Sequence, residues 1–497
     1  MLHPSQNQTA ENRSEEEILL ELESRVCSYG DTVHYAEKPK IFGRCSGSYL
    51  YDIEENPYLD LQMWYSAVNL GYANQRISDA LKRQIDTLPQ LACQYLHREK
   101  IELSEMIVDS VKSGFGMTGR VHFNVGGSQA VEDALKLVRK TTGRQRMLAF
   151  EGGYHGRTLG ASAITSSYRY REAFGEFADR AEFIPYPYTF RSQFPNDPQK
   201  CADYCIELME RKFSHEYTGA WNPRTNKCEF GGFFVEAVQG TGGYVIPPKG
   251  YFKRLEKICR EHGILIVDDE IQMGFHRTGK MWAMEHFEIQ PDIIVFGKAL
   301  TNGMNPISGI WAREELINPK AFGPGSTHST FSSNSLGTAT ALEVMRIFAE
   351  GDYERSVAEK GAHFLKLITD LQTRHPEVGD VDGLGLALRM EMCEADGRTP
   401  SRALADKMFQ LGLEGGLMVD GRELGVILDI GGYFKNVVTL APSLEISYDE
   451  MNLAHRLLEM LIVQAKAELG ASSGRTNIVT SKSPVVADET LSDLVSV

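Results

Sequence analysis

The sequence predicts an α/β fold in which a large body, built on a mainly parallel sheet, carries a smaller α+β domain. Between about residues 74 and 331, short apolar runs alternate with helix-like segments, as they do in consecutive β–α units. The runs 264–267 and 293–296 are apolar at every position, which indicates strands that helices cover on both faces. The 497 residues are enough for about three domains of ordinary size.

Changes of pattern along the chain predict its organisation. A helix-like segment at about 15–27 is followed by a run, 47–72, in which Tyr, Leu and Ile alternate around the turn Glu55-Asn56-Pro57, which predicts a hairpin or meander. Both chain ends are polar and rich in turn-forming residues, so we expect them to be flexible. The predicted segments are a flexible N-terminus at 1–13, an N-terminal segment at 14–73, the large domain at 74–344, the smaller domain at 345–470 and a flexible tail at 471–497.

Composition narrows the functional classes. The 52 basic and 67 acidic residues give a formal charge of −15, which repels nucleic acid and anionic lipid surfaces. No apolar stretch approaches the ~18 residues of a membrane-spanning helix, and the first residues are polar and acidic rather than a secretory signal. The eight cysteines are widely spread and no second ligand pair accompanies Cys201 and Cys205, so we expect reduced thiols, a cytoplasmic location and no metal site.

Ligands of parallel sheets bind at the carboxyl ends of the strands, and two such ends are rich in glycine. Gly126-Gly127-Ser128 precedes a helix, where free N–H groups and a hydroxyl could hold a phosphate, although a plain turn and helix cap has the same pattern. Tyr154 lies among three glycines that allow a flat ligand to approach, so it could stack on a heteroaromatic ring or pack on a neighbouring loop.

Two further strand ends carry charged side chains. The acids Asp268, Asp269 and Glu270 are costly to bury unless a cation meets them, and the alternative is that they point to solvent. Lys298 directly follows the strand 293–296, where apolar surroundings would lower its pKa from ~10.4 and produce a nucleophilic amine of the Schiff-base type; the alternative is a solvated lysine. Together the four strand ends suit pyridoxal 5′-phosphate, which needs a phosphate cradle, a ring contact, a carboxylate for the pyridinium and an amine for the aldehyde.

Residues 274–280 raise the alternative of an ATPase, because they match most of a P-loop. However, Met281 stands where Ser or Thr must bind magnesium, and no strand runs directly into Gly274. Nucleotide hydrolysis is therefore disfavoured.

Five long stretches resemble the class III (ω-type) aminotransferases of the fold-type I pyridoxal-phosphate enzymes, and the similarity runs from about residue 40 to 465. These stretches are GGSQAVEDALK (126–136), FEGGYHGRTLGASAIT (150–165), VEAVQGTGG (235–243), VDDEIQMGFHRTGK to GKALTNG (267–303) and HSTFSSNSL (328–336). The resemblance implies a large domain with a seven-stranded, mainly parallel sheet and a small α+β domain built from both chain ends.

The resemblance also implies the active-site residues. Lys298 would form the Schiff base and move the proton in catalysis, and Asp269 would pair with the pyridinium nitrogen. The implied cofactor contacts also include Gly127, Ser128, Tyr154, Gln272 and Thr330. Because Thr330 would be lent by the neighbouring subunit, we expect a homodimer with shared active sites. The small-molecule partners would be an amine donor and an oxo acid or aldehyde acceptor.

The departures from the family pattern concern the substrate. Members that handle ornithine or 4-aminobutyrate usually have an arginine, paired with the glutamate retained here as Glu236, that holds the α-carboxylate; Thr439 stands in its place. We therefore expect an amine, ω-amino or diamino acid donor. Arg422 and Lys435 are candidates to replace that arginine. The expected pocket wall consists of Trp64, Tyr65 and Ser66, for which core packing is the alternative.

Two other functions are compatible with these residues. An amino-acid racemase, epimerase or aminomutase of the same fold would keep the lysine, the aspartate and the phosphate cradle. A non-catalytic protein of this fold would bind the ligand without turnover, although the intact Lys298, Asp269 and Tyr154 argue against it.

Overall fold

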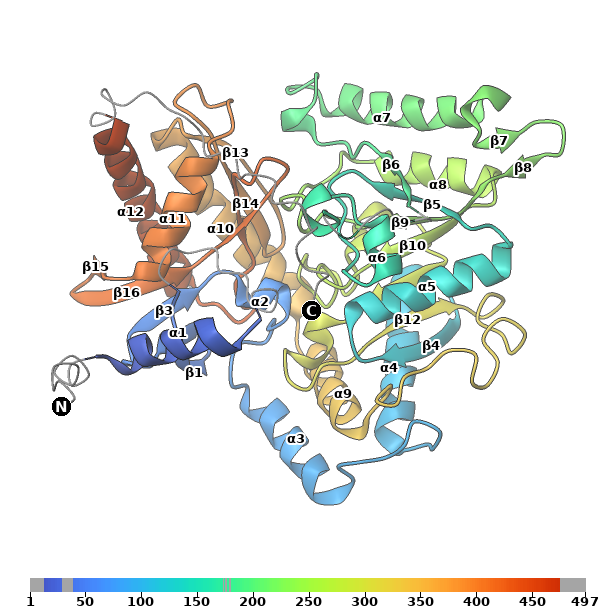
Figure 1. Cartoon of the computed structure of the whole chain (residues 1–497), viewed down its shortest axis with the longest axis horizontal. Coiled ribbons are helices and arrows are strands. Elements are labelled where there is room, and N and C mark those ends of the chain that lie inside the picture. The colour runs from blue at the N-terminus through green and yellow to red at the C-terminus, as the bar shows by residue number, and fades with distance from the viewer. Residues whose placement is uncertain (1–12, 29–38, 173, 175–176, 178–179, 474–497) are drawn as a thin grey trace, which may run out of the picture.

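The computed structural model describes residues 13–28, 39–172, 174, 177 and 180–473, and a seven-stranded sheet forms the middle of its larger body, on the right in Figure 1. The strands lie in the order β4-β12-β11-β10-β9-β5-β6, and only β12 is antiparallel to its neighbours. The predicted seven-stranded, mainly parallel sheet is therefore confirmed. The strands are β4 (Gly119–Asn124), β5 (Arg146–Phe150), β6 (Glu182–Ile184), β9 (Phe230–Val235), β10 (Leu265–Asp269), β11 (Ile293–Phe296) and β12 (Ser308–Arg313).

Both faces of this sheet are buried, as the apolar strands require. Alternate residues of β11 face opposite sides of the sheet. Ile294 and Phe296 pack with buried residues of α4, α7, α8 and α9. Ile293 and Val295 pack with buried residues of α5 and α6. The helices of this domain are α3 (Gln75–Thr87), α4 (Arg98–Phe115), α5 (Gly127–Thr142), α6 (Leu159–Ile164), α7 (Pro198–Phe213), α8 (Tyr251–Glu261) and α9 (Ser335–Glu350). Short elements join them: η1 (Tyr168–Tyr170), η2 (Thr189–Arg191), η3 (Glu216–Thr218), η4 (Ala283–Phe287), η5 (Lys298–Thr301) and the hairpin β7 (Trp221–Asn222) with β8 (Lys227–Cys228).

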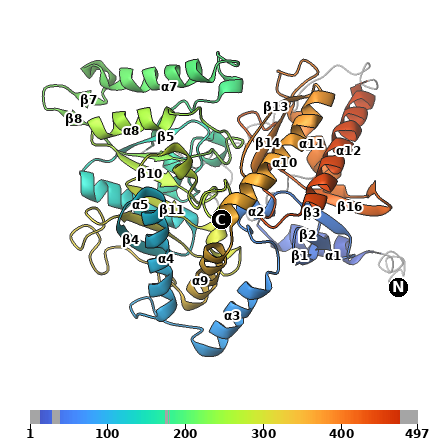
Figure 2. The ribbon, with the colours of Figure 1, turned by 180° about the vertical axis from the view of Figure 1, so that it is seen from behind.

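A second body combines the two ends of the described chain, as Figure 2 shows from behind. Its five-stranded sheet has the order β1-β2-β3-β16-β15, in which β3 pairs in parallel with β16 from the C-terminal part. A second sheet has the order β13-β14-β18-β17. The strands are β1 (Phe42–Ser46), β2 (Tyr49–Asp52), β3 (Pro57–Asp60), β13 (Val378–Leu384), β14 (Ala387–Met392), β15 (Leu417–Val419), β16 (Arg422–Ile427), β17 (Asp429–Gly431) and β18 (Val437–Leu440).

Four helices belong to this second body: α1 (Glu15–Val26), α10 (Tyr353–Arg374), α11 (Arg402–Glu414) and α12 (Tyr448–Ser473). Helix α1 begins with a capping box in which Ser14 and Glu17 exchange hydrogen bonds, which explains why its N-terminus lies at this point. The antiparallel meander β1-β2-β3 confirms the predicted hairpin around the turn at residues 55–57.

The two bodies meet at the fully buried guanidinium of Arg277. It donates hydrogen bonds to the carbonyl oxygens of Leu386 (3.1 Å) and Pro442 (2.6 Å) and to the side chain of Asn69 (2.5 Å). Asn69 in turn donates to the carbonyl oxygen of Phe275 (2.9 Å). These bonds fix the small body against the carboxyl-end edge of the large sheet.

Three of the predicted limits, two between domains and one at a strand end, fall inside elements of the structure. Helix α9 crosses residue 344, because it packs on α3 and α4 while leading into the small body. Helix α12 continues to Ser473, beyond the predicted start of the tail at residue 471. Strand β10 includes Asp268 and Asp269, which we had placed after the strand. The flexibility predicted for 1–12 and 474–497 lies outside the described residues. No helix in the described part of the chain is long and apolar enough to cross a membrane.

Candidate active site

A cavity of about 260 Å³ lies between the two bodies, at the carboxyl ends of β5, β10 and β11. Segment β17 of the small body closes its other side. The lining residues are Tyr65, Tyr154, Arg157, Tyr170, Gly240, Thr241, Gln272, Lys298, Asp429, Ile430, Gly431 and Lys435. Of the residues predicted for the site, the cavity therefore brings together Lys298, Tyr154, Gln272 and Tyr65.

Lys298 occupies a strained turn directly after β11. Its φ of 39° lies in the left-handed region that non-glycine residues rarely adopt, and such strain is concentrated at functional sites. Burial lowers the pKa of its ε-amine, although the negative charges of Asp269, Glu236 and Asp429 partly oppose this effect. A lowered pKa leaves more of the amine neutral, which is the form that attacks a carbonyl.

Asp269 ends β10 as one partner of a buried pair. Its Oδ2 lies 2.7 Å from Nδ1 of His155, and the two side chains are 4% and 1% exposed. Burial by itself lowers the pKa of His155, but the hydrogen bond to Asp269 and the charges of Asp269 and Glu236 raise it overall. The raised pKa favours protonated His155, which is the partner that a buried carboxylate needs. Sequence reasoning missed His155, although the quoted stretch EGGYHG contains it.

The neighbouring acids Asp268 and Glu270 neither point to solvent nor pair with a cation, which were the two expectations. Both are fully buried, and no cation pairs with them among the described residues. Glu270 accepts the N–H of Met284 at 2.8 Å. Burial and the charge of Glu270 raise the pKa of Asp268 well above its usual value. The raised pKa favours the neutral form of Asp268, which is less costly to bury than an unpaired carboxylate.

This arrangement predicts how stability depends on pH. Above about pH 4 an unfolded aspartate has released its proton, whereas the raised pKa of Asp268 favours its retention in the folded chain, so the free energy of unfolding falls as pH rises toward that pKa. Asp268→Asn carries no such proton. Its stability relative to the wild type should therefore increase by about 1 kcal/mol per pH unit over this interval. Urea unfolding of both proteins at several pH values measures the difference, and a pH-independent difference would contradict the prediction.

The N-terminus of α5 forms an anion cradle beside the cavity. Gly126 precedes the helix in an extended conformation, no side chain caps it, and the space that its Cβ would occupy is open. The Oγ of Ser128 accepts the N–H of Arg157 at 3.2 Å. Gly156 must be glycine, because a Cβ there would lie 2.2 Å from this Oγ and its φ is 124°. The free N–H groups of Gly127 and Ser128 suit a phosphate.

Glu236 joins the loops that surround the cavity. Its two carboxylate oxygens accept the N–H groups of Tyr154 (2.9 Å) and Gly240 (2.8 Å). Burial raises its pKa to about 7, with the positive charge of His155 opposing the shift. Gln272 donates to the hydroxyl of Tyr244 at 3.1 Å. An enclosed amine, a carboxylate–histidine pair and an uncapped helix N-terminus together fit pyridoxal 5′-phosphate.

Comparison with known proteins decides the family. The family model described as aminotransferase class-III matches residues 33–462. The chain belongs to the class III aminotransferase family. It is therefore an enzyme of the aminotransferase type that uses pyridoxal 5′-phosphate, with an amine donor and an oxo acceptor as small-molecule partners.

Relatives of this aminotransferase include both transaminases and racemases. An alanine/serine racemase of Pyrococcus horikoshii is 30% identical over 446 residues, which cover 89% of this chain and 90% of the relative. An ornithine aminotransferase of Brevibacillus brevis is 32% identical over 389 residues, which cover 76% and 86%. A PLP-bound amine transaminase structure from an uncultivated Pseudomonas species has a TM-score of 0.77 at 26% identity and covers 88% of this chain and 96% of that one.

The residues predicted for the aminotransferase pocket wall occupy a left-handed turn, α2 (Met63–Ser66), in which φ is 44° to 63°. Tyr65 lines the cavity, whereas Trp64 is 53% exposed and Ser66 is fully buried outside the lining. We had expected all three at the wall. Successive residues of so tight a turn point in different directions, which explains why only one reaches it.

The two candidates to replace the missing arginine lie in different parts of the structure. Arg422 is the exposed first residue of β16 and lies outside the cavity, because β16 pairs with β3 and β15 in the other sheet. Lys435 lines the cavity. Thr439 is buried in β18 and donates a hydrogen bond to Asp429 (2.8 Å), an aspartate that sequence reasoning did not single out. Thr330 is exposed and does not line the cavity of its own chain.

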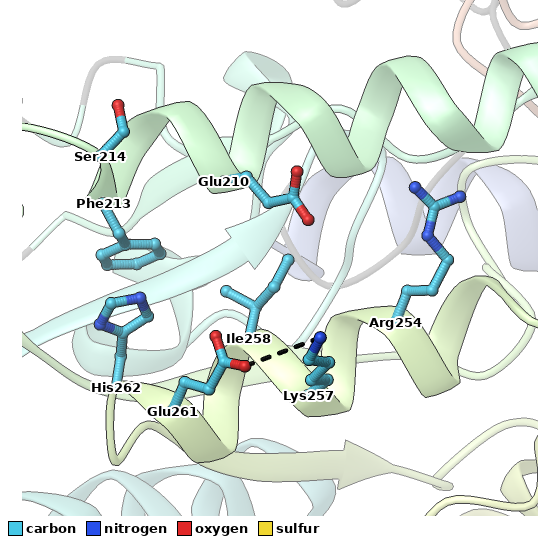
Figure 3. Close-up of a pocket in the computed structure, with 8 residues that line it drawn as sticks. All are labelled: Glu210, Phe213, Ser214, Arg254, Lys257, Ile258, Glu261 and His262. Carbon is cyan, nitrogen blue, oxygen red and sulfur yellow. Dashed lines mark ion pairs between the residues drawn. The ribbon is translucent and has the colours of Figure 1, made fainter.

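A separate surface cavity of about 350 Å³ lies between α7 and α8 (Figure 3). The ring of His262 stacks on Phe213 at 4.3 Å, and Lys257 pairs with Glu261 at 3.9 Å. None of the residues predicted for the aminotransferase site lies there, so the cavity at Lys298 is the candidate active site.

Proposed function

We propose that this aminotransferase takes nitrogen from an amine, ω-amino or diamino donor and passes it to an oxo acid or aldehyde in two half-reactions. The observation that carries the proposal is the position of Lys298, which shares one cavity with Asp429 and whose pKa responds to the negative charge of Asp269. The absence of an arginine at position 439, where Thr439 bonds to Asp429, supports a donor that needs no bidentate carboxylate clamp.

The proposed assignments follow from the surroundings of each residue. Bound pyridoxal 5′-phosphate supplies an aldehyde that captures the amine and a ring that withdraws electrons. Asp269, oriented by His155, would hold a proton at the ring nitrogen. Gly127 and Ser128 would bind the phosphate, and Tyr154 and Gln272 would enclose the ring. Lys298 Nζ would take the proton from the substrate carbon and return it, since its lowered pKa suits a general base.

A single half-reaction tests this proposal. When the holoenzyme is mixed with an amine donor and no acceptor, we expect the cofactor to accumulate in its amine form, together with one equivalent of carbonyl product. Subsequent addition of pyruvate or 2-oxoglutarate should restore the original absorbance. No conversion of the cofactor with any amine in a broad panel would contradict transamination.

Racemisation is the second candidate function, because two relatives named as racemases are about as similar to this chain as those named as aminotransferases. A racemase must hold the α-carboxylate of an amino acid, and Asp429 would repel that group from the cavity wall. The same experiment separates the two: inversion of an enantiopure amino acid without conversion of the cofactor would support a racemase.

We further propose a homodimer with shared active sites. The exposure of Thr330, away from the cavity of its own chain, supports its assignment as a phosphate ligand of the neighbouring subunit. Sedimentation should then give twice the chain mass of 55.5 kDa. We also propose a cytoplasmic location, which the eight free cysteines support.

A further inference from the structure

The cavity wall opposite the large sheet carries a carboxylate in the region where an arginine is usual. Asp429 begins β17 and lies directly across from Thr439 of β18 in the antiparallel register. The Thr439 hydroxyl donates to Oδ2 of Asp429 at 2.8 Å, and Thr439 is 1% exposed. The hydrogen bond fixes Asp429 at the cavity, where it lies among the lining residues together with Lys298.

The negative charge of Asp429 is only partly balanced by positive charges nearby. Among the described residues no lysine, arginine or histidine nitrogen lies within 4.0 Å of it, so Asp429 has no ion-pair partner there. Burial raises its pKa, while the Thr439 hydrogen bond and the more distant charges of Lys435 and Lys298 act in the opposite direction. A cation in the cavity would therefore stabilise the ionised form of this partly desolvated side chain.

We propose that Asp429 binds a second, non-reacting ammonium group of the amino donor, so that the preferred donors are diamines. This inference rests on the proposed transamination. A donor with a distal ammonium forms a charge-assisted hydrogen bond with Asp429, whereas an alkylamine of the same length leaves the carboxylate without a partner. A donor with a distal carboxylate places two negative charges together. Lys435 lies on the same wall, where its positive charge acts on Asp429 from beyond ion-pair distance.

Substrate selectivity tests the assignment. The holoenzyme is assayed with α,ω-diamines of three to six carbons and with the matching alkylamines, and the ratio of kcat/KM within each pair is compared. Asp429→Asn should reduce the highest ratio by about 10- to 100-fold, as expected for loss of a hydrogen bond between charged groups. Asp429→Glu keeps the charge and should retain part of the preference. Glu423→Gln removes an exposed carboxylate outside the cavity and should leave the ratio unchanged.

A binding measurement separates this inference from the proposed function. Lys298→Ala loaded with pyridoxal 5′-phosphate is titrated with each amine, and the cofactor absorbance gives dissociation constants without turnover. A diamine preference that the additional Asp429→Asn change removes supports Asp429 even if the wild type transfers no nitrogen. If the preference is the same with and without Asp429, or if ω-amino carboxylates bind better than diamines, the assignment is wrong.

Discussion

Replacement of Lys298 by alanine is expected to lower turnover by at least about 10³-fold, because both the nucleophilic amine and the proton carrier are lost. The ε-amine is enclosed in the cavity, and its pKa is lowered by burial. Borohydride treatment of the wild-type holoenzyme should fix the cofactor on the peptide that contains Lys298. The variant should give no such adduct. Steady-state kinetics and mass spectrometry of the digested protein provide the two measurements.

The matched control is Lys257→Ala. Lys257 lies in the separate surface cavity between α7 and α8, and its partner Glu261 is exposed. This variant should keep the wild-type rate and the borohydride adduct. An adduct on Lys435, the other lysine that lines the active-site cavity, would show that the nucleophile is misassigned.

The second large effect is expected for Asp269→Asn, which keeps the shape of the side chain but removes its charge. We expect kcat/KM to fall by about 10²- to 10⁴-fold, because the ring nitrogen of the cofactor loses the carboxylate that holds its proton. The His155 ring also loses the neighbouring negative charge that raises its pKa, so we expect the pKa of His155 to fall. Kinetics of the reconstituted variant and the pH dependence of the cofactor absorbance test both consequences.

Asp268→Asn is the control for this change, since Asp268 precedes Asp269 in the same strand. Successive side chains of a strand point to opposite faces, so Asp268 faces away from Asp269, and burial raises the pKa of Asp268, which favours its neutral form. Its kcat/KM should stay close to that of the wild type. Equal losses in the two variants would indicate damage to β10 rather than a specific requirement for Asp269.

The sequence predicted much of the site because its chemistry lies at strand ends. The apolar run 293–296 predicts β11, and Lys298 follows it by two residues. Parallel strands end at one edge of a sheet, so the order of strands and helices already places Lys298, Gln272 and Tyr154 near each other. His155 was missed because its carboxylate partner, Asp269, is distant in sequence, and a histidine in a glycine-rich turn has no local signature.

Tertiary packing decided the other side of the cavity. Asp429 faces Lys298 only because β17 pairs with β18 and because Arg277 and Asn69 hold the two bodies together. The same packing places Arg422 in the other sheet. The sequence by itself thus determined the fold class, the family and the cofactor chemistry. Apolar periodicity and short motifs involve residues that are close together along the chain, so both can be recognised without the structure. Only the tertiary structure decided which charge faces the donor, because that depends on strand register and on contacts between distant segments.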